Sequence, residues 1–228
     1  KIMSILVMKF GGTSVANLSR IKNLQQLVKN KILTGHTKII VVVSAMSGVT
    51  NTLVEQYKKI DSDINKPEYD VILSTGEQYS SALISTFLNK NGVRSRSILG
   101  WQVPIITDNK FSQARIERID TEKILKLFKK FNVLVVAGFQ GISPEGRITT
   151  LGRGGSDTSA VAMAVALKSK ICEIYTDVEG IFSSDPRVVR DAKKIKNITY
   201  EEILEMASLG SKVLHPRSVE LAMKYDIK

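Results

Sequence analysis

Cysteine is nearly absent from this chain of 228 residues, because Cys172 is the only one, and a single thiol cannot close an intrachain disulfide. Proline occurs five times, and no Pro- or Ser-rich linker divides the chain. No apolar run approaches the roughly 18 residues of a transmembrane helix, and the N-terminal stretch lacks the pattern of a signal peptide. We therefore expect a cytoplasmic protein of one domain, without a membrane partner.

Acidic residues are outnumbered, with 22 Asp and Glu against 33 Lys and Arg, which gives a formal net charge of +11. Such an excess is also found in nucleic-acid-binding proteins. Here residues 1–114 hold 14 basic and 7 acidic side chains and the remainder hold 19 and 15, so no basic arm exists. Aromatic residues are few, at 6%, and no nucleic-acid motif occurs. An anionic small substrate accounts for the positive charge, and we expect no nucleic-acid partner.

Apolar runs and helical patterns alternate along the chain. Runs rich in Val and Ile predict strands covered on both faces, at residues 2–8, 37–43, 103–107, 133–137 and 171–176. Helical patterns lie between and after them, at residues 18–30, 51–60, 76–90, 121–130, 156–168, 199–207 and 216–224. This order predicts an α/β fold, a three-layer αβα sandwich with a mostly parallel central sheet. Ligands of such folds bind beyond the carboxyl ends of the strands, so the informative residues should lie there.

The first strand is followed by Lys9, Phe10, Gly11 and Gly12 on the way to a helix. Glycine lets the backbone come close to a ligand, and backbone N–H groups bind phosphate oxygens while Lys9 supplies a positive charge. The lysine precedes the glycines, so this is not a G-x-x-x-x-G-K nucleotide-binding loop. From these residues alone, a phosphate cradle and an ordinary turn with a solvated lysine are equally open.

Residues 149–159 carry the strongest single signal. Three glycines surround Arg153, and Ser156 and Asp157 then open a helix rich in Ala and Val. Free N–H groups at a helix N-terminus, beside a forked guanidinium, form a site for a carboxylate or a phosphate. The segment therefore predicts an anion site.

Three other positions carry weaker signals. Thr50 lies in a hydroxyl-rich stretch with Ser44, and either Thr50 or Asn51 also suits the N-cap of the helix that follows. Glu77 lies in the first turn of the helix expected at 76–90, where the helix dipole favours a carboxylate whatever its function. His215 precedes a proline, and we interpret it as structural. The scattered histidines and carboxylates have no metal-ligand spacing, so no metal site is expected.

Six motifs, in order, resemble the catalytic domain of aspartokinases within the amino acid kinase superfamily. They are K-F-G-G-T-S at 9–14, V-S-A-M at 43–46, G-E at 76–77, T-L-G-R-G-G-S-D at 150–157, T-D-V at 176–178 and K-V-L-H-P-R at 212–217. The likeness covers nearly the whole chain, and its first and fourth motifs are specific to aspartokinases. It implies the amino acid kinase fold and ATP-dependent phosphorylation of the β-carboxylate of L-aspartate. The product is 4-phospho-L-aspartate, which enters lysine, threonine and methionine biosynthesis.

The same resemblance implies roles for single residues. Lys9 contacts the transferring phosphoryl group and Asp157 orients that lysine, so these two are the implied catalytic residues. Those implied for aspartate are Ser44, Thr50, Glu77 (at the α-amino group), Phe139, Arg153 (at the α-carboxylate) and Ser156. Those implied for ATP are Lys9, Gly11, Gly12, Thr176, Asp177, Phe182 (where many relatives have tyrosine), Arg187 and Lys212. Mg²⁺ is expected on the nucleotide phosphates, so no residue is named as its ligand.

The resemblance also bears on domain organisation. Aspartokinases continue into C-terminal ACT domains, which nothing in residues 1–228 resembles, so we expect a truncated catalytic domain and a homodimer for the full-length protein. Other members of the superfamily, namely glutamate 5-kinase, acetylglutamate kinase and uridylate kinase, are the enzymatic alternatives. A basic nucleic-acid-binding protein that retains the fold is the non-enzymatic one.

Overall fold

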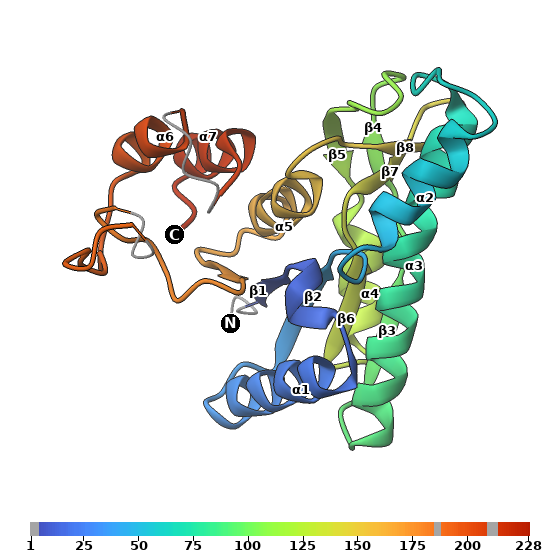
Figure 1. The fold of residues 1–228 in the computed structure, drawn as a ribbon. Helices are drawn as coiled ribbons and strands as arrows, with labels where there is room; N and C mark the ends of the chain where they lie inside the picture. The colour runs from blue at the N-terminus through green and yellow to red at the C-terminus, as the bar shows by residue number, and fades with distance from the viewer. Residues whose placement is uncertain (1–4, 185–187, 209–213) are drawn as a thin grey trace.

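The structure, a computed structural model, describes residues 5–184, 188–208 and 214–228 (Figure 1). Its centre is a sheet with the strand order β3-β6-β2-β1-β9, in which all neighbouring strands are parallel. These strands are β1 (Ile5–Phe10), β2 (Lys38–Val43), β3 (Ser95–Ile98), β6 (Val133–Ala137) and β9 (Cys172–Tyr175). Strands β1 and β6 are buried throughout, as their continuous apolar runs predict, whereas β9 at the sheet edge is half-buried.

Helices cover both faces of this sheet. Alternate residues of β1, such as Met8, pack against α1 (Leu18–Leu33) and α3 (Pro67–Lys90). The residues between them, such as Val7, face the core formed with α4 (Thr121–Phe128) and α5 (Gly155–Ala166). Successive side chains of a strand point to opposite faces, so one strand serves two cores. The predicted three-layer αβα sandwich is confirmed.

A second, mixed sheet lies beyond one end of the first (Figure 1). Its order is β5-β4-β7-β8, formed by β5 (Ile116–Ile119), β4 (Ile105–Thr107), β7 (Gln140–Ile142) and β8 (Ile148–Thr150). The strand expected at 103–107 belongs here and pairs antiparallel with β5, so its assignment to the central sheet was wrong. The other three strands of this sheet were not predicted, because each has only three or four residues and no long apolar run.

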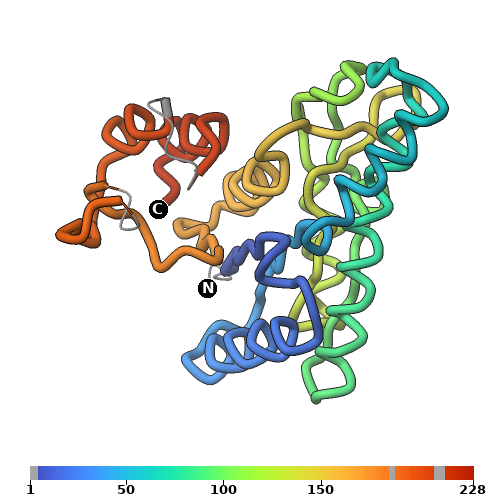
Figure 2. The backbone as a smooth tube through the Cα atoms, in the orientation of Figure 1, coloured from blue at the N-terminus to red at the C-terminus, as the bar shows by residue number. Residues whose placement is uncertain are grey.

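The remaining helices are α2 (Val49–Lys58), α6 (Tyr200–Ser208) and α7 (Pro216–Tyr225), and a short 3-10 turn spans Gly12–Val15. Helix α7 packs against both α5 and α6, so the C-terminal part of the chain returns to the side of the central layers (Figure 2). His215 caps α7, because its Nδ1 accepts from the Arg217 N–H, which agrees with its structural interpretation. Across the described ranges, no helix is long and apolar enough to cross a membrane.

Two helix starts differ from those expected. Helix α3 begins at Pro67 rather than at residue 76, so Glu77 lies in the interior of the helix and not in its first turn. Proline at the first helical position and Glu68 and Asp70 in the first turn favour this earlier start. Helix α2 is capped by Gly48, which has a φ of 86°, so Thr50 is not an N-cap residue.

Candidate active site

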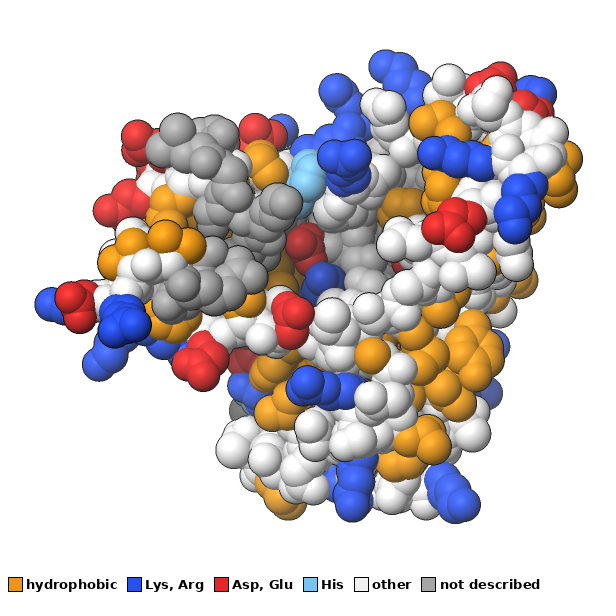
Figure 3. Space-filling model, in the orientation of Figure 1, with side chains coloured by type: hydrophobic (Ala, Val, Ile, Leu, Met, Phe, Trp, Pro, Cys, Tyr) orange, Lys and Arg blue, Asp and Glu red, His pale blue; other side chains and the backbone are white. Residues whose placement is uncertain are grey.

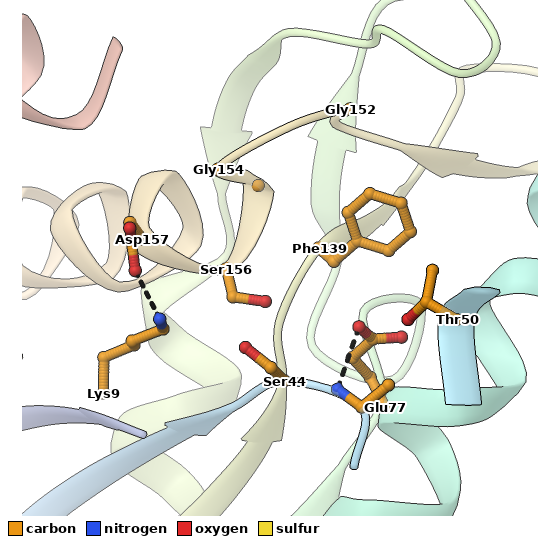
Figure 4. A pocket seen from close by; sticks show the side chains of 11 residues that line it. Lys9, Ser44, Thr50, Glu77, Phe139, Gly152, Gly154, Ser156 and Asp157 are labelled. Atoms are coloured by element: carbon orange, nitrogen blue, oxygen red, sulfur yellow. Dashed lines mark hydrogen bonds and ion pairs between the residues drawn. The ribbon is translucent and has the colours of Figure 1, made fainter. Parts of the chain in front are cut away.

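A cavity of about 250 Å³ opens at the carboxyl ends of the central strands. The space-filling view shows this face hollowed, with side chains of both charges inside the hollow (Figure 3). Strand ends, two helix starts and the interior of α3 all contribute to its wall (Figure 4). The lining residues are Lys9, Ser44, Ala45, Thr50, Glu77, Phe139, Gly152, Gly154, Gly155, Ser156 and Asp157.

Lys9 and Asp157 form an ion pair at one end of the cavity. The Lys9 Nζ lies 2.6 Å from Asp157 Oδ1, and the two side chains are only 11% and 13% exposed. Lys9 comes from the end of β1, and Asp157 lies in the first turn of α5, where the helix dipole favours its negative charge. The pair supplies a fixed, largely dehydrated ammonium group at a helix N-terminus, which is suited to an anion.

Glu77 lies at the opposite end of the cavity and is 3% exposed. Its Oε1 accepts from the Ala45 N–H at 3.0 Å, whereas its buried Oε2 has no hydrogen-bond partner among the described residues. Burial raises the pKa of this carboxyl from 4.5 to about 7, and the Ala45 N–H opposes the shift. A buried oxygen that lacks a partner and lines a cavity is suited to bind a donor on a ligand, above all a cation.

Two hydroxyl groups lie between these charged ends. Figure 4 shows Ser44 and Ser156 between the Lys9–Asp157 pair and Glu77. Phe139 and Thr50 lie toward the Glu77 end of the cavity, away from the ion pair. The polar groups thus line a small space with an ammonium at one end and a carboxyl at the other. Such a space is complementary to a small molecule that carries both a negative and a positive group.

Phe139 is held in a strained backbone conformation, with a φ of 68°. Its N–H donates to Ser159 Oγ at 3.0 Å, and its carbonyl accepts from the Leu151 N–H at 2.9 Å. Left-handed backbone is rare for a bulky residue, and such residues concentrate at functional sites. The two hydrogen bonds fix the aromatic wall of the cavity against the neighbouring loop.

The loop of residues 151–154 packs against α7 on its other side. Arg217 donates to the Leu151 carbonyl at 2.9 Å. A Cβ atom at Gly154, which has a φ of 67°, would lie 2.3 Å from the Cβ of His215. Only glycine fits there, both for its φ and for the contact.

The structure brings together seven of the residues implied by sequence, namely Lys9, Ser44, Thr50, Glu77, Phe139, Ser156 and Asp157. Arg153 does not line the cavity: its side chain is exposed, although its neighbours Gly152 and Gly154 do line it. The Gly11 N–H donates to the Tyr175 carbonyl at 3.1 Å and is therefore engaged within the protein.

The other residues implied for ATP lie near Gly11 or farther along the chain. Gly12 begins the 3-10 turn after β1. Thr176 and Asp177 follow β9, which is paired with β1, so they emerge at the same end of the sheet, exposed and hydrogen-bonded to each other at 3.0 Å. Phe182 is half-buried and forms an isolated antiparallel bridge with Lys194. Arg187 and Lys212 lie outside the described residues.

Comparison with known proteins gives the family. A sequence model described as the amino acid kinase family matches residues 4–228. The chain belongs to the amino acid kinase family. An aspartokinase from Rickettsia felis is 50% identical over 228 residues, which cover 99% of this chain and 57% of the relative. This amino acid kinase chain therefore spans little more than half the length of that curated relative.

Solved structures agree with this assignment. An aspartate kinase from Synechocystis superposes with a TM-score of 0.84 at 48% identity, over 98% of this chain and 37% of that one. Aspartokinase III from E. coli, crystallised with aspartate and ADP, gives a TM-score of 0.86 at 29% identity, over 98% of this chain and 60% of that one. The amino acid kinase fold implied by sequence is confirmed.

Four further residues line the cavity of this amino acid kinase: Ala45, Gly152, Gly154 and Gly155. The three glycines belong to the anion site predicted at 149–159, whereas Ala45 was given no role from the sequence, because a methyl group is rarely distinguished from scaffold by a sequence pattern. A metal site is a separate question, and over the described ranges no three Asp, Glu, His or Cys side chains come together to form one.

Proposed function

We propose that this chain is the catalytic domain of an aspartokinase, which transfers the γ-phosphoryl group of ATP to the β-carboxylate of L-aspartate. The observation that carries the proposal is the pairing, in one cavity of about 250 Å³, of the free Glu77 Oε2 with the Lys9–Asp157 ion pair. An α-ammonium group bound at Glu77 leaves the β-carboxylate directed toward Lys9. The relatives named as aspartokinases, at about 50% identity, support the same substrate.

The chemistry requires no general base, because a carboxylate is already a nucleophile near neutral pH. A β-carboxylate oxygen attacks the γ-phosphorus, the bond from that phosphorus to the bridging oxygen breaks, and ADP leaves with the electron pair. Catalysis then consists of positioning and of charge stabilisation by Lys9. When bound with the nucleotide, Mg²⁺ would supply further neutralisation of charge, and we name no protein ligand for it.

The remaining roles follow the family pattern. Ser44, Thr50, Phe139 and Ser156 contact aspartate, and Arg153, whose neighbours Gly152 and Gly154 line the cavity, binds its α-carboxylate. Gly12, Thr176, Asp177 and Phe182 contact ATP, as do Gly11, Arg187 and Lys212. Residues 1–228 form the catalytic domain of a longer, cytoplasmic protein, which is a homodimer at full length. Its product, 4-phospho-L-aspartate, enters lysine, threonine and methionine biosynthesis.

The decisive experiment is a coupled ADP-release assay on the full-length protein, with aspartate, glutamate, N-acetylglutamate and UMP as separate acceptors. We expect turnover with aspartate alone, together with 4-phospho-L-aspartate as the product. Turnover with another acceptor and not with aspartate would assign a different kinase activity. Steeply salt-dependent binding to DNA or RNA, with no ATP turnover, would instead favour the nucleic-acid alternative.

Substitution of Arg153 tests the contact with the α-carboxylate. Arg153→Lys keeps the charge and removes the fork of two N–H donors, so the aspartate KM should rise roughly tenfold or more while the ATP KM stays unchanged. Steady-state kinetics with each substrate varied in turn measures both constants. Arg147→Lys is the matched control, because Arg147 is half-exposed and paired with Glu68 on the surface. An unaltered aspartate KM in Arg153→Lys removes Arg153 from the substrate site.

A further inference from the structure

Asp70 is a fully buried carboxylate, and it takes part in no ion pair within the described ranges. Its charge is met by hydrogen bonds alone. The Ser112 N–H lies 3.0 Å from each of its oxygens, the Thr150 N–H lies 2.6 Å from Oδ2, and the Thr150 hydroxyl lies 2.8 Å from Oδ1. Burial raises the pKa of Asp70, and these hydrogen bonds oppose the shift. A buried carboxyl that accepts from two backbone N–H groups and a hydroxyl fixes the positions of the segments that carry these donors.

The segments held by Asp70 form the base of the cavity loop. Thr150 ends β8, and the chain passes from it directly into residues 151–154, of which Gly152 and Gly154 line the cavity. The Ser112 segment supports the same loop, since the Ala114 N–H donates to the Thr150 carbonyl at 2.9 Å. A Cβ atom at Gly152 would lie 3.0 Å from the Ser112 carbonyl oxygen. Asp70 therefore anchors both the loop of residues 151–154 and the Ser112 segment to one point of α3.

That point lies on the same helix face as Glu77. Both residues belong to α3 and are seven positions apart, which is close to two turns, so their side chains project in similar directions. Between them, the Ser74 carbonyl accepts from Gln140 Nε2 at 3.0 Å, which joins the helix to β7. Helix α3 thus carries both Glu77, whose carboxyl faces the cavity, and Asp70, which anchors the loop on the opposite side of the cavity.

We propose that Asp70 is a positioning residue that sets the loop of residues 150–154 at its distance from Glu77 and thereby sets the affinity for the amino-acid substrate. The inference rests on the proposed function for the identity of that substrate. Asp70 does not line the cavity. Its effect is transmitted through Thr150 to the cavity wall.

The test is Asp70→Asn in the full-length protein, with two readouts. An asparagine presents an NH₂ group where one oxygen accepted N–H donors, so the loop loses part of its anchor. The aspartate KM should rise on the order of tenfold while the ATP KM stays within about twofold. Independently of any substrate, amide hydrogen exchange in a peptide covering residues 148–156 should become roughly tenfold faster, with β1 and β2 unchanged.

Two further variants keep the test decisive. Glu68→Gln is the matched control, because Glu68 lies on the same helix and pairs on the surface with Arg147, the residue just before β8. Both readouts should match the wild type. Thr150→Val removes only the hydroxyl donor to Asp70 and should shift both readouts in the same direction by a smaller factor. It carries the test if Asp70→Asn does not fold.

The outcomes separate the two proposals. Faster exchange together with a raised aspartate KM supports the positioning role. A folded Asp70→Asn protein with an unchanged aspartate KM overturns it, whatever the exchange rate. If the wild-type protein does not phosphorylate aspartate but another acceptor, the proposed function fails on its own, and the KM measurement is made with that acceptor.

Discussion

Lys9→Ala is expected to lower the kcat for aspartate phosphorylation by roughly 10²-fold or more, which corresponds to a few kcal/mol of transition-state stabilisation. The reason is the position of the Lys9 ammonium group, which is 2.6 Å from Asp157, nearly buried, and at the end of β1 where the phosphoryl group is proposed to lie. The charge on the phosphoryl oxygens changes during transfer, so a fixed cation stabilises the transition state more than it stabilises the bound aspartate. The aspartate KM should change much less than kcat.

Asp157→Asn should follow the same pattern, because the lysine then loses the carboxylate that orients it. If the two residues act as one unit, the double variant is little slower than the slower single variant. Lys31→Ala is the control, since Lys31 also forms an ion pair, with Glu173 at 2.5 Å, but does not line the cavity. Its kcat should stay at the wild-type value. Strictly additive losses, or near-wild-type turnover in Lys9→Ala, would contradict the assignment.

Glu77→Gln should have the second largest effect on activity. The variant should bind aspartate more weakly, and above pH 7 it should be more stable than the wild type. The variant keeps an acceptor for the Ala45 N–H but removes the charge that binds the α-ammonium group. The loss of a desolvated, charge-assisted hydrogen bond, on the order of 2 kcal/mol, should raise the aspartate KM about 30-fold and leave the ATP KM unchanged. An equal rise in both constants would indicate a general defect instead.

The stability of the same variant depends on pH. Glu77 has a pKa of about 7 in the folded protein and 4.5 as its ordinary value, so the folded chain holds a proton that the unfolded chain has lost between these pH values. The contribution of Glu77 to stability is thus fully present below pH 4.5, falls as pH rises toward 7 and stays low above it. Glu77→Gln removes this fall, which amounts to roughly 3 kcal/mol at pH 8. Urea unfolding of both proteins at pH 5 and pH 8 measures the difference, and parallel pH profiles would contradict the assigned pKa.

Most of the central sheet was predictable because burial on both faces leaves a plain signal, but β3, with the sequence Ser-Arg-Ser-Ile and no apolar run, was not predicted. The runs in β1, β2 and β6 are almost wholly apolar and only five or six residues long, which favours buried strands over helices. Apart from β4, the second sheet left no such signal, since β7 and β8 have three residues each and include Gln140, Thr149 and Thr150. Their polar side chains are buried through tertiary hydrogen bonds, which a local pattern does not contain.

The site was predictable to the extent that it lies at strand ends. Lys9 lies at the end of β1, Ser44 follows β2 and Asp157 lies in the first turn of α5, and these are the places where ligands bind in α/β folds. Their specific roles, and the choice of Phe139, came from the family resemblance instead. Asp70 offered no signal of its own, because its partners Ser112 and Thr150 are 42 and 80 residues away along the chain.

The contact between Gly154 and His215 has an evolutionary consequence. A side chain at position 154 and the side chain of His215 in its present place exclude one another, since even a methyl group would lie 2.3 Å from the His215 Cβ and 2.3 Å from Cγ of its ring. The two positions lie 61 residues apart in sequence, one on the cavity loop and the other capping α7. Exchange of His215 for any residue with a Cβ atom leaves this clash in place, and position 154 still has a φ of 67°, so a change at position 215 alone does not release the glycine. Position 154 is therefore expected to stay glycine even in relatives that cap this helix with a residue other than histidine.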